Sequence, residues 1–198
     1  MKLLYQTHSP YARKVLVFAH EAGIAEQIEV VHHETSPTQR NAQVFAENPL
    51  GKVPVLIRRD ATPLFDSDVI CAYLDTVHCG RSLIPPEGEA RWCALRLQAM
   101  AQGLADAGIA LRWETVRRPV ELRYAPLREG YTEKLISSYD WLERYLDVAD
   151  PIHVGHIALA TCLSWQEFRE LPSFRPDRPR PRWPRRRSVQ SETPPTRP

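Results

Sequence analysis

Two nearby segments of the chain carry groups that could hold a bound peptide. Val53-Pro54 stands where a strand is predicted to begin, although proline cannot donate to a sheet ladder. Proline makes a cis peptide bond accessible, and such a bond would leave the Val53 N–H and C=O free to pair with a peptide backbone. Asp66 and Ser67 follow shortly after. Their carboxylate and hydroxyl suit the charged amino end and the carboxylate of that peptide.

A third polar group lies near the start of the chain. Ser9 precedes Pro10, and serine before proline is typical of a helix start with Ser9 as the N-cap. The first N–H groups of a helix favour an anion, so the hydroxyl would lie beside a site suited to negative charge. The alternative is that Ser9 only caps the helix.

The first 80 residues predict a small α/β domain with the element order βαβαββα. Alternating apolar residues indicate strands, while proline, serine and glycine mark the helix ends. The domain is predicted to have helices on both faces of its sheet. The expected elements are a strand at 2–5, a helix from 9 to 23, a strand at 28–31, a short helix within 36–47, strands at 53–58 and 62–65, and a helix from 66 to about 74.

The remainder of the chain predicts an all-α domain, so the fold class is α/β plus all-α. Residues 81–89 form a linker rich in proline and glycine, and residues 90–172 carry apolar residues at helical spacing. Helices are expected at 90–117, around 127–146 and at 154–168. Residues 173–198 contain seven prolines and eight arginines, a composition typical of a disordered basic tail.

Composition indicates which partners and which cell compartment to expect. The net charge is +2, and since the tail carries eight arginines against one Asp and one Glu, the rest of the chain is mildly acidic. Nucleic-acid binding is therefore not expected, except through the tail. The four cysteines form no C-x-x-C pair and no set of metal ligands, which favours free thiols in the cytoplasm and no metal. No apolar run is long enough to span a membrane.

Residues 1 to about 172 resemble the cytosolic glutathione S-transferase family, in its bacterial serine/cysteine type with a thioredoxin-like N-terminal domain. The tail does not fit the family's usual closing helices, which favours either a C-terminus that is read out of frame or a disordered arm that binds anionic partners. The motifs that carry the resemblance are Ser9–Val15, Asn48–Leu56, Leu64–Ile70 with Tyr73-Leu74, and Ile157–Ala160.

The resemblance implies a binding site for glutathione as co-substrate. The Val53 backbone would pair with the cysteinyl part of glutathione, and Pro54 would be the cis-proline. Asp66 and Ser67 would bind the γ-glutamyl end, with Ser67 also capping the helix that follows. Lys52 would lie beside the tripeptide, within reach of its glycyl carboxylate.

The resemblance also implies what Ser9 does. Related glutaredoxins have Cys-Pro-Tyr-Cys where this chain has Ser9-Pro10-Tyr11-Ala12, so disulfide exchange by the protein is not expected. The Ser9 hydroxyl would instead donate to the sulfur of glutathione and stabilise its thiolate. Tyr5 is a rival for this role, because some classes of the family use a tyrosine there. His8 adjoins the same position.

The expected function is glutathione transfer to a small hydrophobic electrophile. The electrophile site would lie between the domains, partly lined by the helix around 104–113. The alternative is a non-enzymatic or defective relative that acts by binding. The family is commonly dimeric, which implies a homodimer through residues 90–104 and 66–75. One departure is His153 where the family has a helix-capping Ser or Thr; since a neutral histidine is a poor N-cap, the cap is expected to be missing.

Overall fold

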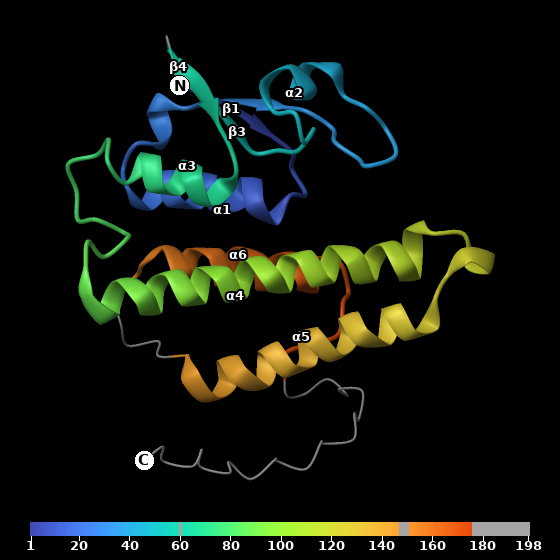
Figure 1. Cartoon of the computed structure of the whole chain (residues 1–198). Helices are drawn as coiled ribbons and strands as arrows, with labels where there is room; N and C mark the ends of the chain where they lie inside the picture. Colours follow the sequence, from blue (N-terminus) through green and yellow to red (C-terminus); the bar gives the residue numbers. More distant parts are fainter. Residues whose placement is uncertain (60, 147–150, 176–198) are drawn as a thin grey trace, which may run out of the picture.

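The computed structural model describes residues 1–59, 61–146 and 151–175 (Figure 1). A four-stranded sheet with its helices forms the first part of the chain, and helices alone form the second. The elements are β1 (Lys2–Tyr5), α1 (Pro10–Glu21), η1 (Ala25–Gln27), β2 (Glu29–His32), α2 (Ala42–Glu47), β3 (Val55–Arg58), β4 (Ala61–Leu64), α3 (Ser67–Leu74), α4 (Gly88–Arg112), the π-helical turn η2 (Trp113–Arg117), η3 (Val120–Leu122), α5 (Ala125–Tyr145) and α6 (Val154–Phe168).

The strand order in the sheet is β2-β1-β3-β4. β1 and β2 are parallel, as expected for a strand–helix–strand unit, while β3 is antiparallel to both β1 and β4. The β1–β3 ladder ends with Leu4 opposite Val55, and Leu56 of β3 lies opposite Leu64 of β4. The predicted order βαβαββα is confirmed.

Local sequence signals explain where the helices begin and end. The Ser9 hydroxyl accepts a hydrogen bond from the Ala12 N–H at 3.2 Å, and Pro10 occupies the first helical position of α1. Gly23 follows that helix with φ = 69°, a conformation that favours glycine. Asn41 caps α2 by accepting from two backbone N–H groups.

Helices cover both faces of the sheet, as predicted. On one face, Leu3 and Leu56 pack in a buried cluster with residues of α1 and α3. On the other face, Leu4 and Val55 pack with Val44 of α2. Alternating residues of β1 therefore enter different cores, which is the period-two pattern of a strand buried on both sides.

The helical part packs α4 against both α5 and α6, and α6 lies beside α4 beneath α1 (Figure 1). A second buried cluster joins these helices and includes Leu104, Leu135 and Cys162. The first cluster crosses the predicted boundary between domains, because it contains Val154 and Ile157 of α6 as well as residues of the sheet.

Two predictions about the helical part need correction. The helix expected at 90–117 ends its regular α-helical turns at Arg112 and continues as the π-helical turn η2. The cap expected to be missing from α6 is present: the Nδ1 atom of His153 accepts a hydrogen bond from the Gly155 N–H at 3.1 Å. An imidazole nitrogen without its proton is an acceptor, so it can replace the usual hydroxyl.

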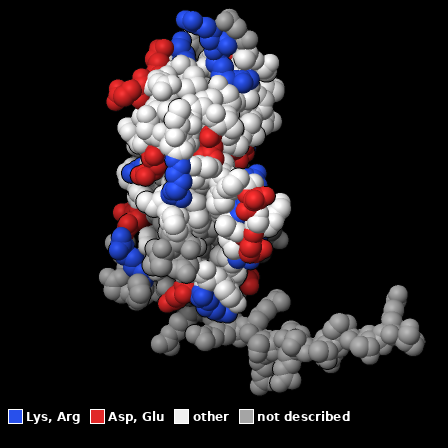
Figure 2. Space-filling model, turned by 90° about the vertical axis from the view of Figure 1, so that its left-hand side faces the viewer, with Lys and Arg blue, Asp and Glu red and all other residues white. Residues whose placement is uncertain are grey.

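The surface shown in Figure 2 carries acidic and basic side chains interspersed with uncharged ones. No helix in the described part of the chain is long and apolar enough to cross a membrane. The predicted disorder of the basic tail concerns residues that lie almost entirely outside the described ranges.

Candidate functional site

The strand directions bring the predicted site segments to one edge of the sheet. The chain leaves β1 after Tyr5 and reaches Ser9 through a short loop. Because β3 is antiparallel to β1, the residues before Val55 lie at that same edge. Because β4 is antiparallel to β3, the residues after Leu64 return there as well. Ser9, the segment 52–54 and the pair 66–67 therefore occupy neighbouring loops.

Ser9 holds its side chain at the N-terminus of α1. Its Oγ atom accepts from the Ala12 N–H, which uses a lone pair and leaves the hydroxyl proton free to be donated. The Ser9 N–H donates to the Gln6 carbonyl at 2.9 Å, which fixes the turn before the helix. The hydroxyl thus lies where the helix dipole favours negative charge.

The loop before β3 is fixed by the buried side chain of Asn48. Its Nδ2 atom donates to the Lys52 carbonyl at 2.9 Å, and its Oδ1 atom accepts from the Leu50 N–H at 3.0 Å. Gly51 has φ = 62°, and a Cβ there would meet the ring of Phe45 at 2.2 Å. The conformation of this loop therefore depends on both residues.

The Val53–Pro54 peptide bond at the end of this loop is cis. Val53 is buried and lies two residues before Val55, the first residue of β3 that pairs with β1. The Val53 backbone is therefore not part of the β1–β3 ladder. The Lys52 side chain is exposed beside it. The unpaired Val53 backbone and the charged Lys52 side chain therefore lie next to each other, where both could contact a ligand.

Asp66 and Ser67 open α3, and the prediction that Ser67 caps this helix is wrong. The cap is Asp66, whose Oδ1 atom accepts from the N–H groups of Asp68 at 3.0 Å and Val69 at 3.4 Å. Ser67 is the first residue of the helix rather than its cap. Its side chain is 1% exposed, and within the described residues its Oγ atom has no hydrogen-bond partner.

Tyr5 and His8, the two other candidates for the role of Ser9, have different surroundings. Tyr5 is partly buried and packs against the core cluster on the α1 side of the sheet. His8 is exposed, and its ring stacks on Phe168 of α6 with 5.2 Å between ring centroids. The loop that carries Ser9 is therefore in contact with the helical part of the protein.

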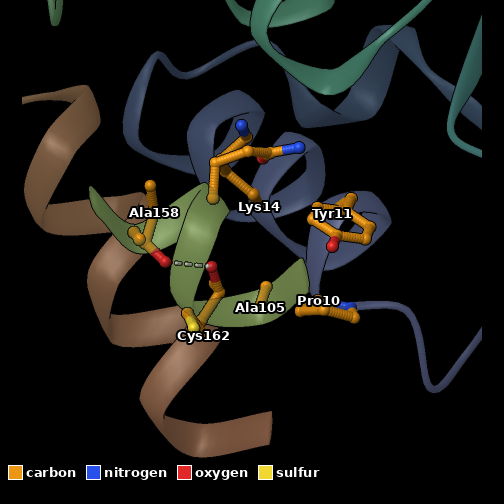
Figure 3. Close-up of a pocket in the computed structure, with 9 residues that line it drawn as sticks. Pro10, Tyr11, Lys14, Ala105, Ala158 and Cys162 are labelled. Atoms are coloured by element: carbon orange, nitrogen blue, oxygen red, sulfur yellow. Dashed lines mark hydrogen bonds between the residues drawn. The ribbon is translucent and has the colours of Figure 1, made fainter. Parts of the chain in front are cut away.

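A pocket lies between α1 and the helices α4 and α6 (Figure 3). Pro10, Tyr11 and Lys14 line it from α1; the other lining residues are Ala101, Gln102, Ala105, Ala158, Thr161 and Cys162. The pocket lies between the sheet and the helical part of the chain, and of its lining residues only Ala105 comes from the stretch 104–113, where the electrophile site is predicted.

The pocket contains a polar contact that sequence reasoning missed. The Tyr11 hydroxyl donates a hydrogen bond to Asp106 of α4. Burial raises the pKa of Tyr11 far above its usual value, and the bond to Asp106 raises it further. The tyrosine is therefore neutral and fixes α1 to α4. No sequence signal connects these residues, because they are far apart in the chain and belong to different elements.

Neither a metal nor a reactive protein thiol is indicated at this site. Among residues 1–59, 61–146 and 151–175, no three His, Cys, Asp or Glu side chains gather as metal ligands would. Cys162 lines the pocket, but burial raises the pKa of its thiol to about 12. It therefore stays protonated at neutral pH and is a poor nucleophile.

A thioredoxin-like sheet followed by an all-helical second half is the architecture of the glutathione S-transferases. The family model described as "Glutathione S-transferase, N-terminal domain" matches residues 8–77. The "Uncharacterized GST-like protein YibF" of Escherichia coli (strain K12) is 30% identical over 184 residues, covering 90% of this chain and 89% of that protein. The chain belongs to the glutathione S-transferase family.

Solved structures agree with this assignment. A glutathione transferase family member from Pseudomonas fluorescens Pf-5, crystallised with bound glutathione, has 35% sequence identity and a TM-score of 0.82. The match covers 85% of this chain and 83% of that one. A second structure of the Pseudomonas fluorescens protein, with bound S-(propanoic acid)-glutathione, has 34% identity and a TM-score of 0.78. It covers the same shares of the two chains. The thioredoxin-like and all-helical fold of the family is thus confirmed.

Proposed function

We propose that this protein is a glutathione transferase that joins glutathione to a small hydrophobic electrophile in the cytoplasm. The observation that carries the proposal is the buried Ser67 hydroxyl, which has no partner within the described residues. A buried hydroxyl without a hydrogen bond is costly, and the carboxylate of a bound ligand would supply the missing acceptor. The hydroxyl lies in the first turn of α3, where N–H groups and the helix dipole favour a carboxylate.

Glutathione offers groups that match this edge of the sheet. Its γ-glutamyl carboxylate would accept from Ser67, and its charged amino group would pair with the exposed Asp66. Its cysteinyl backbone would bond to the Val53 backbone, and the Lys52 ammonium would lie near the glycyl carboxylate. The relative from Pseudomonas fluorescens, with glutathione in its structure, supports this assignment of the ligand.

Ser9 would activate the sulfur of the bound tripeptide. Its hydroxyl proton is available to donate to the thiolate, and the N-terminus of α1 favours the same charge. The thiol proton leaves to solvent, and the thiolate forms a bond to an electrophilic carbon while the leaving group departs with its electron pair. The neutral Cys162 thiol beside the pocket does not compete as a nucleophile.

Calorimetry with glutathione, followed by conjugation of 1-chloro-2,4-dinitrobenzene, tests this proposal. Ser9→Ala should raise the pKa of the bound glutathione thiol by about 1 to 2, because a hydrogen bond to a charged group is worth about 1.5–3 kcal/mol. The pH–rate profile should shift upward while the Kd for glutathione stays similar. Tyr5→Phe serves as the comparison, and an unchanged profile for Ser9→Ala with a shifted one for Tyr5→Phe would transfer the role to Tyr5.

Two further outcomes of this experiment decide between classes of function. Binding of glutathione without turnover of any electrophile would favour a non-enzymatic binding protein. Failure to bind glutathione would contradict both hypotheses.

We also propose a homodimer, for which the exposed Trp92 on α4 and Val69 on α3 offer apolar contacts. Light scattering in solution tests this proposal.

A further inference from the structure

Three arginines occupy the C-terminal ends of α4 and α6. Arg112 is the last residue of α4, Arg117 is the last residue of the π-helical turn η2, and Arg169 is the C-cap of α6. They come from segments that are distant in sequence. Two contacts and one helical turn bring them together.

Contacts around Gly108 place Arg169 beside Arg112. A Cβ at Gly108 would lie 3.0 Å from the Trp165 ring and 2.9 Å from the Leu171 side chain, so this part of α6 lies directly against this part of α4. Arg169 lies between those two contact residues in the chain. Arg112 follows Gly108 by one turn of helix.

The π-helical turn keeps Arg117 near the same position. The Arg118 N–H donates to the Trp113 carbonyl at 2.8 Å, which is the five-residue spacing of a π-helix. Residues five apart therefore return to similar sides of this turn, as Arg112 and Arg117 do. Burial lowers the pKa of Arg112, and the charges of Arg169 and Arg117 lower it further.

The described residues provide no counter-ion for this cluster. No ion pair among them includes Arg112, Arg117 or Arg169, and the Nε atom of Arg169 is buried without a hydrogen-bond partner. Two acidic residues close to the cluster in the chain pair with other arginines: Glu114 with Arg118 at 2.8 Å, and Glu167 with Arg175 at 2.6 Å. Glu170 is exposed and enters none of these pairs.

The cluster borders the loop that carries Ser9. The Phe168 ring stacks on His8 at 5.2 Å, and the Arg169 guanidinium lies 4.8 Å from the centre of the same ring. His8 directly precedes Ser9. One aromatic ring therefore separates an uncompensated guanidinium from the loop where the sulfur of glutathione would be activated.

We propose that Arg112, Arg117 and Arg169 bind a carboxylate on the second substrate, so that the protein conjugates glutathione to small electrophilic carboxylic acids. This inference rests on the proposed glutathione transferase function. Three cations without a partner repel one another, and a bound anion relieves that repulsion. The forked guanidinium group matches the two oxygens of a carboxylate.

A matched pair of electrophiles tests the inference: 4-chloro-3,5-dinitrobenzoate and 4-chloro-3,5-dinitrobenzamide. In both, the glutathione sulfur bonds to the ring carbon, and chloride leaves with the bonding electrons. Each kcat/KM is divided by the uncatalysed rate constant in the same buffer, which removes the different reactivity of the two rings. The wild-type protein should then favour the acid over the amide, and added salt should reduce this preference.

Single variants assign the preference to the cluster. Arg169→Gln and Arg112→Gln should each lower kcat/KM for the acid by roughly 10- to 100-fold, the range for loss of one charged hydrogen bond, and leave the amide unchanged. Arg117→Gln, at an exposed position, carries the same test if a partly buried variant fails to fold. Arg128→Gln on α5 is the control, because it removes the same charge from an exposed site and should change neither rate.

Separate outcomes overturn the inference and the proposed function. Equal treatment of acid and amide by the wild type, or equal losses for both in the arginine variants, overturns the carboxylate site while leaving the transferase function intact. Lack of glutathione binding overturns the function itself. If glutathione binds without turnover, calorimetry with the two synthetic conjugates decides: tighter binding of the acid conjugate, lost in Arg169→Gln, supports the site, and equal binding overturns it.

Discussion

Replacing Ser67 with alanine should stabilise the free protein and weaken glutathione binding. Both effects would come from the loss of one atom, the hydroxyl oxygen. The Oγ atom is buried without a partner in the described structure. An unsatisfied buried hydroxyl costs about 1–3 kcal/mol, and the methyl group that replaces it loses only a few contacts. We expect the free energy of unfolding to rise by about 1 kcal/mol, which corresponds to a Tm increase of roughly 2–4 °C.

The same change removes a donor to the γ-glutamyl carboxylate. A hydrogen bond to a charged group contributes about 1.5–3 kcal/mol, so the Kd for glutathione should rise by roughly 10- to 100-fold. Thermal unfolding without ligand and calorimetry with glutathione measure the two effects. Ser82→Ala is the control, because that hydroxyl already bonds to Asp75 and to the Ile84 carbonyl. It should lower stability by about 1 kcal/mol and leave the Kd unchanged.

The reasoning about Ser67 fails if Ser67→Ala behaves like Ser82→Ala. A loss of stability with unchanged affinity would mean that the Ser67 hydroxyl stabilises the fold and does not contact the ligand.

Two other predictions concern the support of the site and the response of the fold to acid. Asn48→Ala removes two hydrogen bonds from the loop before Val53, so urea unfolding should show a loss of about 2 kcal/mol and calorimetry a weaker affinity for glutathione; unchanged affinity would mean that the loop does not shape the site. Burial raises the pKa of Asp75, but hydrogen bonds from Ser82, Leu83, His78 and Ile84 outweigh it, so the folded pKa is lowered. The carboxylate therefore adds stability above its unfolded pKa of about 3.9, and this stability is lost as the pH falls toward the folded pKa. Thermal melts below about pH 5 should show a weaker pH dependence for Asp75→Asn than for the wild type, and equal slopes would contradict the assignment.

Much of the fold could be predicted because its signals are local. Ser9-Pro10 marks the start of α1, Gly23 marks its end, and apolar periodicity marks α6 at its observed bounds. The meeting of the three site segments at one edge follows from the antiparallel directions of β1 and β3 and of β3 and β4. The residue that caps α3 was harder to predict, since Asp66 and Ser67 are both good caps. Only the backbone conformation decides which of them lies outside the helix.

Tertiary features of the site could not be predicted from the chain. Asp106 bonds to Tyr11 only because the fold brings α4 close to α1, and Arg112 lies near Arg169 only because α4 and α6 lie side by side. No residue pattern in the sequence predicts the π-helical turn that brings Arg117 back toward Arg112 and Arg169. The cap at His153 depends on which ring nitrogen carries the proton, and that is set by the Gly155 N–H in the folded chain.

The buried cluster that crosses the domain boundary connects the proposed glutathione site at the sheet edge to the helical half of the protein. Phe18 of α1 and Leu56 of β3 share that cluster with Val154 and Ile157 of α6. Removing the helical half would leave this apolar surface of α1 open to water, so the sheet and the helices should unfold in one cooperative transition. The conformation of the loops at the proposed glutathione site is therefore stabilised by residues far from them. In hydrogen exchange, the amides of α1 and α6 should share one opening free energy.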